Sequence, residues 1–216
     1  MQGDIFSRST DVKVAVIGGG TGSFTVLSGL KHYTRKIVAL VNMADDGGST
    51  GKLRDELGVL PPGDVRQCLV ALSRTPEMRD LFNYRLQGGS LDGHAFGNLF
   101  LTALEQMTGD FGKAVELASE VLNIAGVVEP TTLSDVKLGL RDAENGDTVG
   151  EFQIAHKSFA AGRPELFLTP TPTVNPRAIQ AIEDADIIVI SPGNLYGSLA
   201  PALLVPGMGE ALAEAG

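Results

Sequence analysis

A glycine-rich turn near the N-terminus constrains this chain more than any other segment. Residues 12–17 (VKVAVI) form a short run rich in β-branched side chains that ends directly in glycines, which is typical of a buried parallel strand. After the turn, apolar residues recur at helical spacing, at Phe24, Leu27 and Leu30. Residues 37–41 (IVALV) form a second apolar run. Strand, glycine turn, helix and strand predict a βαβ unit, and therefore an α/β protein with a parallel sheet.

Caps and apolar spacing predict several helices after the second strand. Asp64 is expected to cap a helix that runs through Leu72, and Thr75-Pro76 is expected to begin another. Asp110 is expected to cap a further helix. The clearest helix is predicted by a continuous apolar stripe: Phe96, Leu99, Phe100, Ala103, Leu104 and Met107.

The pattern changes between about residues 127 and 170. Apolar and polar residues alternate in two short runs that flank Asn145-Gly146: Val136, Leu138 and Leu140, then Phe152 and Ile154. This alternation around Asn-Gly predicts an antiparallel β-hairpin, inserted in the fold or at its edge. Residues 187–190 (IIVI) then return to a buried strand. We expect one domain over residues 1–216, with the C-terminal part of its fold missing, because a parallel sheet would normally continue past the last helix.

Composition excludes several classes of protein. The formal net charge is −9 and the basic residues are scattered, so a nucleic acid would be repelled and is not an expected partner. The single cysteine, Cys68, lies among apolar residues, excludes an internal disulfide framework and fits a reducing compartment. No apolar run is long enough to cross a bilayer, and residues 1–13 do not resemble a signal peptide. We expect a cytoplasmic protein without membrane insertion.

Three polar, glycine-rich segments follow predicted strands: residues 18–22, 42–51 and 191–197. In open parallel sheets, ligands bind at the carboxyl ends of the strands, where loops and helix N-termini converge. We therefore expect the three segments to lie together at one ligand site.

The first of these segments is suited to hold a phosphate. Glycine has no Cβ, so the backbone can approach a pyrophosphate, and N–H groups at the start of the next helix can point at the anion. The dinucleotide fingerprint G-x-G-x-x-G is not met, because Ser23 follows the last glycine. The alternative is a tight turn that only packs helix on strand. The candidate residues are Gly18, Gly19, Gly20, Thr21 and Gly22.

The second segment carries two adjacent carboxylates, Asp45 and Asp46. Carboxylates at a strand end can hold a divalent cation or accept hydrogen bonds from ribose hydroxyls, and Asp45 is the candidate metal ligand. The segment ends in Gly-Lys, but a P-loop is rejected because Leu53 follows the lysine in place of Ser or Thr. The alternative is a solvated acidic loop. The remaining candidates in this segment are Gly47, Gly48 and Ser49.

Three further candidates stand near predicted helix starts: Arg66, His94 and Asn98. An arginine would help to neutralise a phosphate in an otherwise acidic chain, although the segment around it also reads as a simple helix entry. A histidine with no Cys, His or carboxylate at ligand spacing is more often structural than catalytic. No Ser-His-Asp or Cys-His arrangement is recognisable, so no catalytic residue is assigned.

Taken together, these motifs resemble a known family. The resembling segments span nearly the whole chain: IGGGTG (17–22), ADDGGSTGKLRDELG (44–58), PPGDVRQCLVALS (61–73), GHAFGNLFLTAL (93–104), TGDFGKAVELASEVLNI (108–124) and ISPGNLYGSLAPALLVPG (190–207). The sequence resembles the YvcK-like proteins, also called gluconeogenesis factors, within the wider family that includes the CofD 2-phospho-L-lactate transferases.

The resemblance implies a Rossmann-like fold, with an open, mostly parallel sheet flanked by helices. It implies binding of a nucleotide sugar, UDP-N-acetylglucosamine (UDP-GlcNAc), by a regulator of carbon flux into the cell wall and of cell shape without established enzymatic activity. The CofD branch instead transfers a phospholactyl group from a guanosine diphosphate donor to a deazaflavin, with a divalent metal such as Mg²⁺. The Gly-Gly-Ser-Thr-Gly run after Asp45-Asp46 favours the YvcK-like side.

By position in the resemblance, residues 18–22 would cradle the diphosphate with the paired aspartates beside it. Gly193, Asn194 and Tyr196 match the loop that faces the ligand in the family, although that loop reads SPGNLYGS here and is usually closer to GPGSLYTS. A UDP-sugar sensor is the leading expectation and a phospholactyl transferase the second. A nicotinamide-dependent oxidoreductase is disfavoured by the broken fingerprint. A homo-oligomer is compatible with the sequence.

Overall fold

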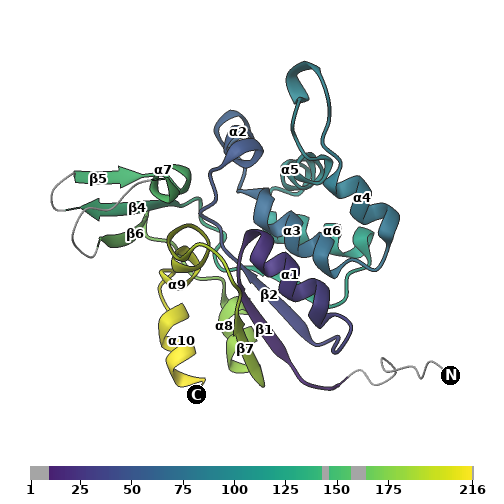
Figure 1. Cartoon of the computed structure of the whole chain (residues 1–216), viewed down its shortest axis with the longest axis vertical. Helices are drawn as coiled ribbons and strands as arrows, with labels where there is room; N and C mark the ends of the chain where they lie inside the picture. The colour runs from purple at the N-terminus through teal and green to yellow at the C-terminus, as the bar shows by residue number, and fades with distance from the viewer. Residues whose placement is uncertain (1–9, 143–145, 157–163, 216) are drawn as a thin grey trace.

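The computed structural model describes residues 10–142, 146–156 and 164–215 (Figure 1). Its main sheet consists of parallel strands in the order β3-β2-β1-β7. The strands are β1 (Val14–Gly18), β2 (Ile37–Val41), β3 (Val127–Pro130) and β7 (Ile187–Ile190). The predicted βαβ unit and the open parallel sheet of a Rossmann-like α/β fold are confirmed.

Helices cover both faces of this sheet (Figure 1). On one side pack α1 (Gly20–Leu30), α3 (Pro62–Leu72), α4 (Pro76–Asn83), α5 (Phe96–Thr108) and α6 (Phe111–Leu122). On the other side pack α8 (Pro176–Glu183), α9 (Ala200–Leu203) and α10 (Met208–Glu214). Alternate residues of β1 point to the two cores, with Val14 and Val16 on the first side and Ala15 and Ile17 on the second.

A smaller antiparallel sheet, in the order β5-β4-β6, projects beside the main sheet (Figure 1). An antiparallel pair forms in the predicted region, between β4 (Lys137–Asp142) and β5 (Gly146–Val149), but its second strand is earlier in the chain than predicted. Asn145 of the predicted turn lies outside the described residues. β6 (Glu165–Thr169) pairs with the other edge of β4. β3 belongs to the parallel sheet, so the antiparallel unit begins after β3 instead of at residue 127.

The predicted strand for Phe152 and Ile154 is wrong. Both residues lie in α7 (Glu151–Ala155), where Ile154 is buried and Phe152 is exposed. The first backbone N–H groups of this short helix donate to the side chain of Asp46, which is more than 100 residues earlier in the chain. A contact at that sequence distance overrides the local alternation of apolar and polar residues.

Two helix predictions also need correction. Asp64 lies in the first turn of α3, whose N-cap is Pro61. α5 begins at Phe96 as predicted, but much of its apolar stripe is only half-buried, and Met107 is 70% exposed. The buried positions of α5 are Gly97, Asn98, Leu101 and Thr102. Because α5 packs against α3, α4 and α6, these neighbours select its buried face.

Other local predictions are confirmed. Thr75 precedes α4 as its N-cap with Pro76 at the first helical position, and Cys68 is buried in the core. The Asp110 side chain accepts a hydrogen bond from the Lys113 N–H (3.0 Å) at the start of α6. β7 is less buried than predicted, because it is an edge strand of the described sheet. Within the described residues, no helix has the length and apolar character needed to cross a membrane.

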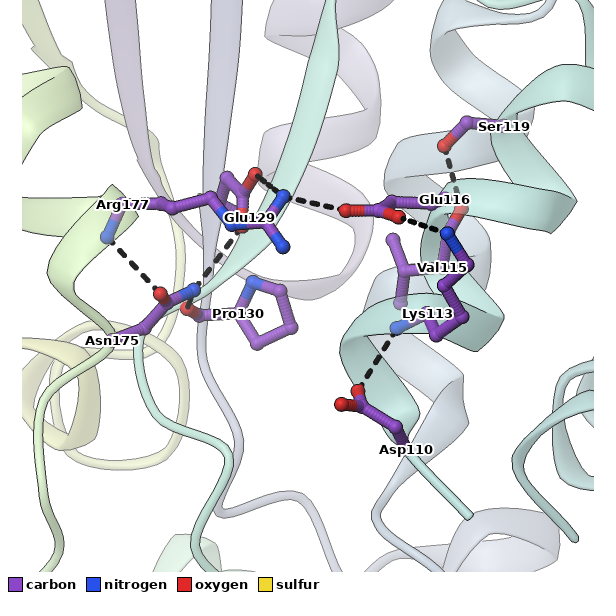
Figure 2. A network of polar contacts seen from close by, with 9 residues as sticks. All are labelled: Asp110, Lys113, Val115, Glu116, Ser119, Glu129, Pro130, Asn175 and Arg177. Carbon is purple, nitrogen blue, oxygen red and sulfur yellow. Dashed lines mark hydrogen bonds and ion pairs between the residues drawn. The ribbon is translucent and has the colours of Figure 1, made fainter. Parts of the chain in front are cut away.

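A polar network crosses the edge of the main sheet that β3 forms, opposite the β7 edge (Figure 2). Arg177 on α8 donates from Nη1 to Glu116 on α6 (2.7 Å) and to Glu129 on β3 (3.4 Å). Asn175, the N-cap of α8, donates to Glu129 (3.1 Å) and to the carbonyl of Pro130 (2.9 Å). The network ties helices from the two faces together around the edge strand.

Candidate functional site

The three glycine-rich segments meet at one edge of the parallel sheet, as predicted. They follow the last residues of β1, β2 and β7, which run parallel to one another. Oγ of Ser23 lies 3.0 Å from Oγ of Ser191, and Nδ2 of Asn42 donates to the carbonyl of Gly197 (3.2 Å). The site is therefore assembled from segments up to 168 residues apart.

Close packing within the protein explains part of the glycine turn. A Cβ on Gly22 would lie 1.5 Å from the carbonyl oxygen of Pro192, and a Cβ on Gly19 would lie 2.0 Å from Oδ2 of Asp64. Gly20, the first residue of α1, has a φ of +61°, and its Cβ position is open except for Oδ1 of Asp64 at 3.6 Å. The turn thus packs α1 on the third segment and also leaves room at the N-terminus of the helix.

The remaining two residues of the turn, Gly18 and Thr21, differ in their surroundings. A Cβ on Gly18 would lie 2.0 Å from Oγ of Ser191, so this glycine also permits close packing. The Thr21 side chain is exposed, and its backbone carbonyl accepts a hydrogen bond from the Thr25 hydroxyl (2.9 Å). Thr21 is therefore open to a ligand, whereas Gly18 is enclosed by the protein.

The N-terminus of α1 faces a carboxyl group of the protein itself, Asp64. The Gly20 N–H donates a hydrogen bond to the Asp64 side chain. Burial, followed by the negative charge of Asp45, raises the pKa of Asp64 to about 8, so the group carries a proton at neutral pH. Sequence reasoning treated Asp64 as a helix cap. The tertiary structure instead places it against the glycine turn.

Asp45 lies close to Asp64 in the same polar cluster. Its carboxylate accepts hydrogen bonds from the Gly47 N–H (3.0 Å) and from the Thr50 hydroxyl. A Cβ on Gly63 would lie 2.3 Å from Oγ1 of Thr50 and 2.8 Å from Oδ2 of Asp45, so α3 approaches this loop through a glycine. Burial raises the pKa of Asp45, and its hydrogen bonds oppose that shift.

Asp46 has a different environment from Asp45. Its two carboxylate oxygens accept hydrogen bonds from the N–H groups of Phe152 (2.8 Å) and Glu151 (3.1 Å), at the start of α7. A Cβ on Gly197 would lie 2.0 Å from Oε1 of Glu151, so the Glu151 side chain rests against the third segment. Burial, then Asp45 and Asp46, raise the pKa of Glu151 to about 6. Asp46 thus joins the small sheet unit to the site.

The remaining predicted residues of the second segment begin α2 (Gly48–Leu57). Gly47 is the N-cap, and Gly48 has a φ of +48° with open space around its Cβ position. Ser49 follows in the first turn of α2. Its Oγ lies 2.8 Å from Nδ1 of His94, which precedes α5, and 3.4 Å from Nδ2 of Asn98 on α5. The predicted loop is therefore shorter than residues 42–51.

Four predicted residues form one hydrogen-bonded chain: Ser49, His94, Asn98 and Arg66. Oγ of Ser49 lies 2.8 Å from Nδ1 of His94, and Nδ2 of Asn98 donates to Oγ of Ser49 (3.4 Å). Nε of Arg66 donates to Oδ1 of Asn98 (2.9 Å), and its Nη1 donates to Oδ1 of Asn83. His94 is buried, and its contact with Ser49 connects the start of α2 to the loop before α5.

The third segment is organised around Asn194. Its side chain accepts hydrogen bonds from the N–H groups of Tyr196 (2.9 Å) and Gly197 (3.0 Å), and so caps the π-helical turn η2 (Leu195–Leu199). The Tyr196 ring packs partly against the core of the small sheet. Gly193 is exposed, with Cβ of Ser198 3.3 Å from its own Cβ position. These contacts shape the loop.

Sequence reasoning missed several polar residues that the fold buries at this site. Besides Asp64, they include Asn42, Thr50 and Arg54. Arg54 binds the Asp135 side chain and the carbonyl of Val136 through Nη2, while its Nε and Nη1 are buried without a partner in the described residues. Sequence reading finds the buried face of a helix from the spacing of its apolar residues. A buried polar residue such as Arg54 does not add to that spacing, so the sequence alone does not indicate its burial.

The donor groups at the site fit a hard divalent cation shared with a ligand. Among the described residues, no three His, Cys, Asp or Glu side chains gather closely enough to hold a metal ion by themselves. Asp45, Asp64 and the Thr50 hydroxyl offer oxygen ligands, and Mg²⁺ usually takes one or two carboxylates together with phosphate oxygens and water. Burial is the larger cause of the raised pKa of Asp64, and a cation there would offset both this burial of charge and the repulsion from Asp45.

A protein-family profile matches nearly the whole chain. Residues 14–216 match the family described as 2-phospho-L-lactate transferase CofD. The chain belongs to the CofD family. This confirms, at the level of the family, the resemblance carried by the glycine turn and the aspartate-glycine run.

Curated relatives are gluconeogenesis factors. The gluconeogenesis factor of Bacillus subtilis (strain 168) is 46% identical over 207 residues, which cover 94% of this chain and 64% of that protein. The gluconeogenesis factor of Halalkalibacterium halodurans is 45% identical over 205 residues, which cover 93% of this chain and 63% of that protein.

The fold also matches a solved structure. A crystal structure of a Bacillus halodurans protein superposes with a TM-score of 0.89 at 43% identity, over 94% of this chain and 66% of that one. The CofD-family chain described here thus spans between 63% and 66% of the length of these relatives.

Proposed function

We propose that this CofD-family chain binds a nucleotide sugar of the UDP-GlcNAc type and acts as a regulatory protein in the cytoplasm. In this proposal it links carbon metabolism to cell-wall synthesis and cell shape. One observation carries the proposal: the N-terminus of α1 and the buried carboxyls of Asp45 and Asp64 converge at the carboxyl edge of the parallel sheet. The gluconeogenesis factors among its relatives support the regulatory role.

The diphosphate in this proposal lies at the N-terminus of α1. Backbone N–H groups and the helix dipole favour an anion there, and Gly20 leaves the approach open. One of these N–H groups, that of Gly20, is already bonded to Asp64. A Mg²⁺ ion held by Asp45 and Asp64 would neutralise charge on both the carboxyls and the diphosphate.

Isothermal titration calorimetry with UDP-GlcNAc, GDP and NAD, each with and without Mg²⁺, tests the proposal. We expect UDP-GlcNAc to bind most tightly and NAD not to bind. Gly20→Ala is expected to abolish binding, because its Cβ would enter the open space at the helix N-terminus.

Gly109→Ala is the matched control. Gly109 has a φ of +69° at the C-terminus of α5, with open space around its Cβ position, so both substitutions strain the backbone by about 1–2 kcal/mol. Loss of affinity in both variants, or in neither, would contradict a binding role for the glycine turn.

A second candidate function is supported by the family description and by the paired carboxyls. In a CofD-type transfer, an acceptor oxygen of a deazaflavin bonds to the phosphorus that carries the lactyl group, and a nucleoside monophosphate leaves. Asp45 and Asp64 would hold the cation that stabilises the departing phosphate. Mass spectrometry after incubation with such a donor and acceptor tests this. Product that disappears in Asp45→Asn would favour the transferase over the sensor.

A further inference from the structure

A basic cavity lies beside the ends of α1 and α3, on the face of the sheet that these helices cover. Its volume is about 310 Å³, and the described residues that line it are Lys31, His32, Ser73, Arg74, Arg79 and Ala125. Three of these six residues are lysine or arginine, one is histidine, and none is acidic. The chain as a whole has a formal net charge of −9, so this lining is the reverse of its average composition.

The cavity lies at the opposite end of α1 from the glycine turn. Lys31 is the C-cap of α1, and the 11 residues of this helix span about 16 Å at 1.5 Å per residue. Arg74 follows the C-cap of α3, and Ala125 shortly precedes β3. Because each connecting helix runs antiparallel to the strands, these positions lie at the amino ends of the strands. The cavity is therefore separate from the candidate site at the carboxyl edge.

Hydrogen bonds join the elements that form the walls of this basic cavity. Nζ of Lys31 donates to the carbonyls of Ala71 (2.7 Å) and Ser73 (2.9 Å), at the end of α3. Oγ of Ser73 donates to the carbonyl of Leu122 (2.9 Å), at the end of α6. The ends of α1, α3 and α6 are thus tied to one another, and the cavity between them is preformed.

Arg79 brings a second basic side chain to the cavity from α4. Its backbone N–H donates to the carbonyl of Thr75 (3.1 Å), and the Thr75 N–H donates to Oγ of Ser73 (3.2 Å). α4 therefore starts at the cavity wall. Burial, and then the positive charge of Arg79, lower the pKa of Lys31, as expected for two cations that line one cavity.

The protein supplies no negative charge to these basic side chains. Within the described residues, no carboxylate oxygen lies within 4.0 Å of Lys31, Arg74 or Arg79. Glu77, in the first turn of α4, does not line the cavity. Nε of Arg79 is buried without a hydrogen-bond partner in the described residues, which is unfavourable for a donor. A bound anion would bring both an acceptor and the missing negative charge.

We propose that the basic cavity binds the phosphate group of a small phosphorylated molecule. A phosphate monoester carries about 1.5–2 negative charges at pH 7, so it neutralises more of this lining than a monocarboxylate does. A guanidinium group can also bind phosphate through two parallel hydrogen bonds, and Arg74 and Arg79 both line the cavity. A volume of about 310 Å³ is at the lower end of the range for small-molecule pockets, which fits a small monoester.

This inference goes beyond the proposed function and does not depend on it, because the two sites lie at opposite edges of the sheet. Calorimetric titration of the full chain with glycerol 2-phosphate tests it, with inorganic phosphate, acetate and glycerol as matched probes. We expect saturable binding of glycerol 2-phosphate that weakens with salt, at least tenfold weaker binding of acetate, and no binding of glycerol. Weaker binding of inorganic phosphate would identify a monoester as the ligand, and equal binding would identify free phosphate.

Substitutions locate the binding in the basic cavity. Arg74→Gln and Arg79→Gln should each weaken glycerol 2-phosphate at least tenfold. Arg35→Gln is the matched control, because it removes the same charge at an exposed residue before β2 that does not line the cavity, and it should bind as the wild type does. Because Arg74 is exposed, Arg74→Gln decides the matter even where Arg79→Gln does not fold.

The outcomes separate the basic cavity from the proposed nucleotide-sugar site. Gly20→Ala should lose UDP-GlcNAc and keep glycerol 2-phosphate. If the wild type binds glycerol 2-phosphate through Arg74 but binds no UDP-sugar, the proposed function fails and the phosphate site stands. Four results would overturn the phosphate site: no saturable binding, wild-type affinity in Arg74→Gln, an equal loss of affinity in Arg35→Gln, or displacement by saturating UDP-GlcNAc.

Discussion

Replacing Asp64 with Asn is expected to stabilise this protein while weakening its cation-dependent ligand binding. Asp64 is buried, and burial together with Asp45 raises its pKa from 3.8 to about 8. Holding such a group protonated at pH 7 costs about 4 kcal/mol, at about 1.4 kcal/mol for each of the roughly three pH units above 3.8. Asn is uncharged and keeps an oxygen that accepts the hydrogen bond from the Gly20 N–H.

The effect of Asp64→Asn has a definite pH dependence. Below pH 4 the Asp64 carboxyl is protonated in both the folded and the unfolded states, so the variant gains nothing. Between pH 4 and 8 the Asp64 carboxyl ionises in the unfolded chain and stays protonated in the folded protein. The stability of the wild type therefore falls relative to that of the variant as the pH rises. Above pH 8 the difference is constant. At pH 7 the difference of about 4 kcal/mol, which is still below its plateau, corresponds to a rise in melting temperature of about 8–16 °C for a domain of this size.

Thermal unfolding followed by circular dichroism at pH 4 to 9 measures this effect, with Asp55→Asn as the control. Asp55 is an exposed carboxylate on α2, so its substitution should leave the melting temperature nearly unchanged. A melting-temperature difference for Asp64→Asn that is independent of pH, or a loss of stability at pH 7, would refute the reasoning. Calorimetry on the same variant should show weaker Mg²⁺-dependent binding of UDP-GlcNAc.

Three further substitutions probe other parts of the molecule. Gly22→Ala should destabilise the fold by about 3 kcal/mol or more, because its Cβ would overlap the carbonyl of Pro192. Gly29→Ala on the same helix is the control: its Cβ enters open space, so it should stabilise the fold by about 0.5–1 kcal/mol. Denaturant titrations measure both effects. Glu105→Gln should raise the melting temperature above pH 6 by the equivalent of about 1 kcal/mol and have no effect below pH 4, because burial raises the pKa of this half-buried carboxyl to about 6. Asp46→Ala should speed amide hydrogen exchange at the start of α7 and cost about 1–2 kcal/mol, since two N–H groups lose their acceptor.

The regular elements around the sheet were predictable because they are encoded locally. The β-branched run before Gly18, the proline after Thr75 and the side chain of Asp110 act within a few residues of their own position. The failures involve contacts from distant segments. Phe152 and Ile154 alternate as a strand would, yet α7 forms because Asp46 accepts its first N–H groups.

The sequence by itself determined the βαβ opening, the membership of the family and the three segments that lie at the carboxyl edge of the sheet. Which side chains face which partner was decided by the tertiary structure alone. Asp64 turns toward the glycine turn and Arg66 toward α4 and α5, although both belong to one motif of α3. The reason is physical: periodicity specifies an element and its buried face, but the direction of a polar side chain depends on neighbouring elements that the chain supplies from far away.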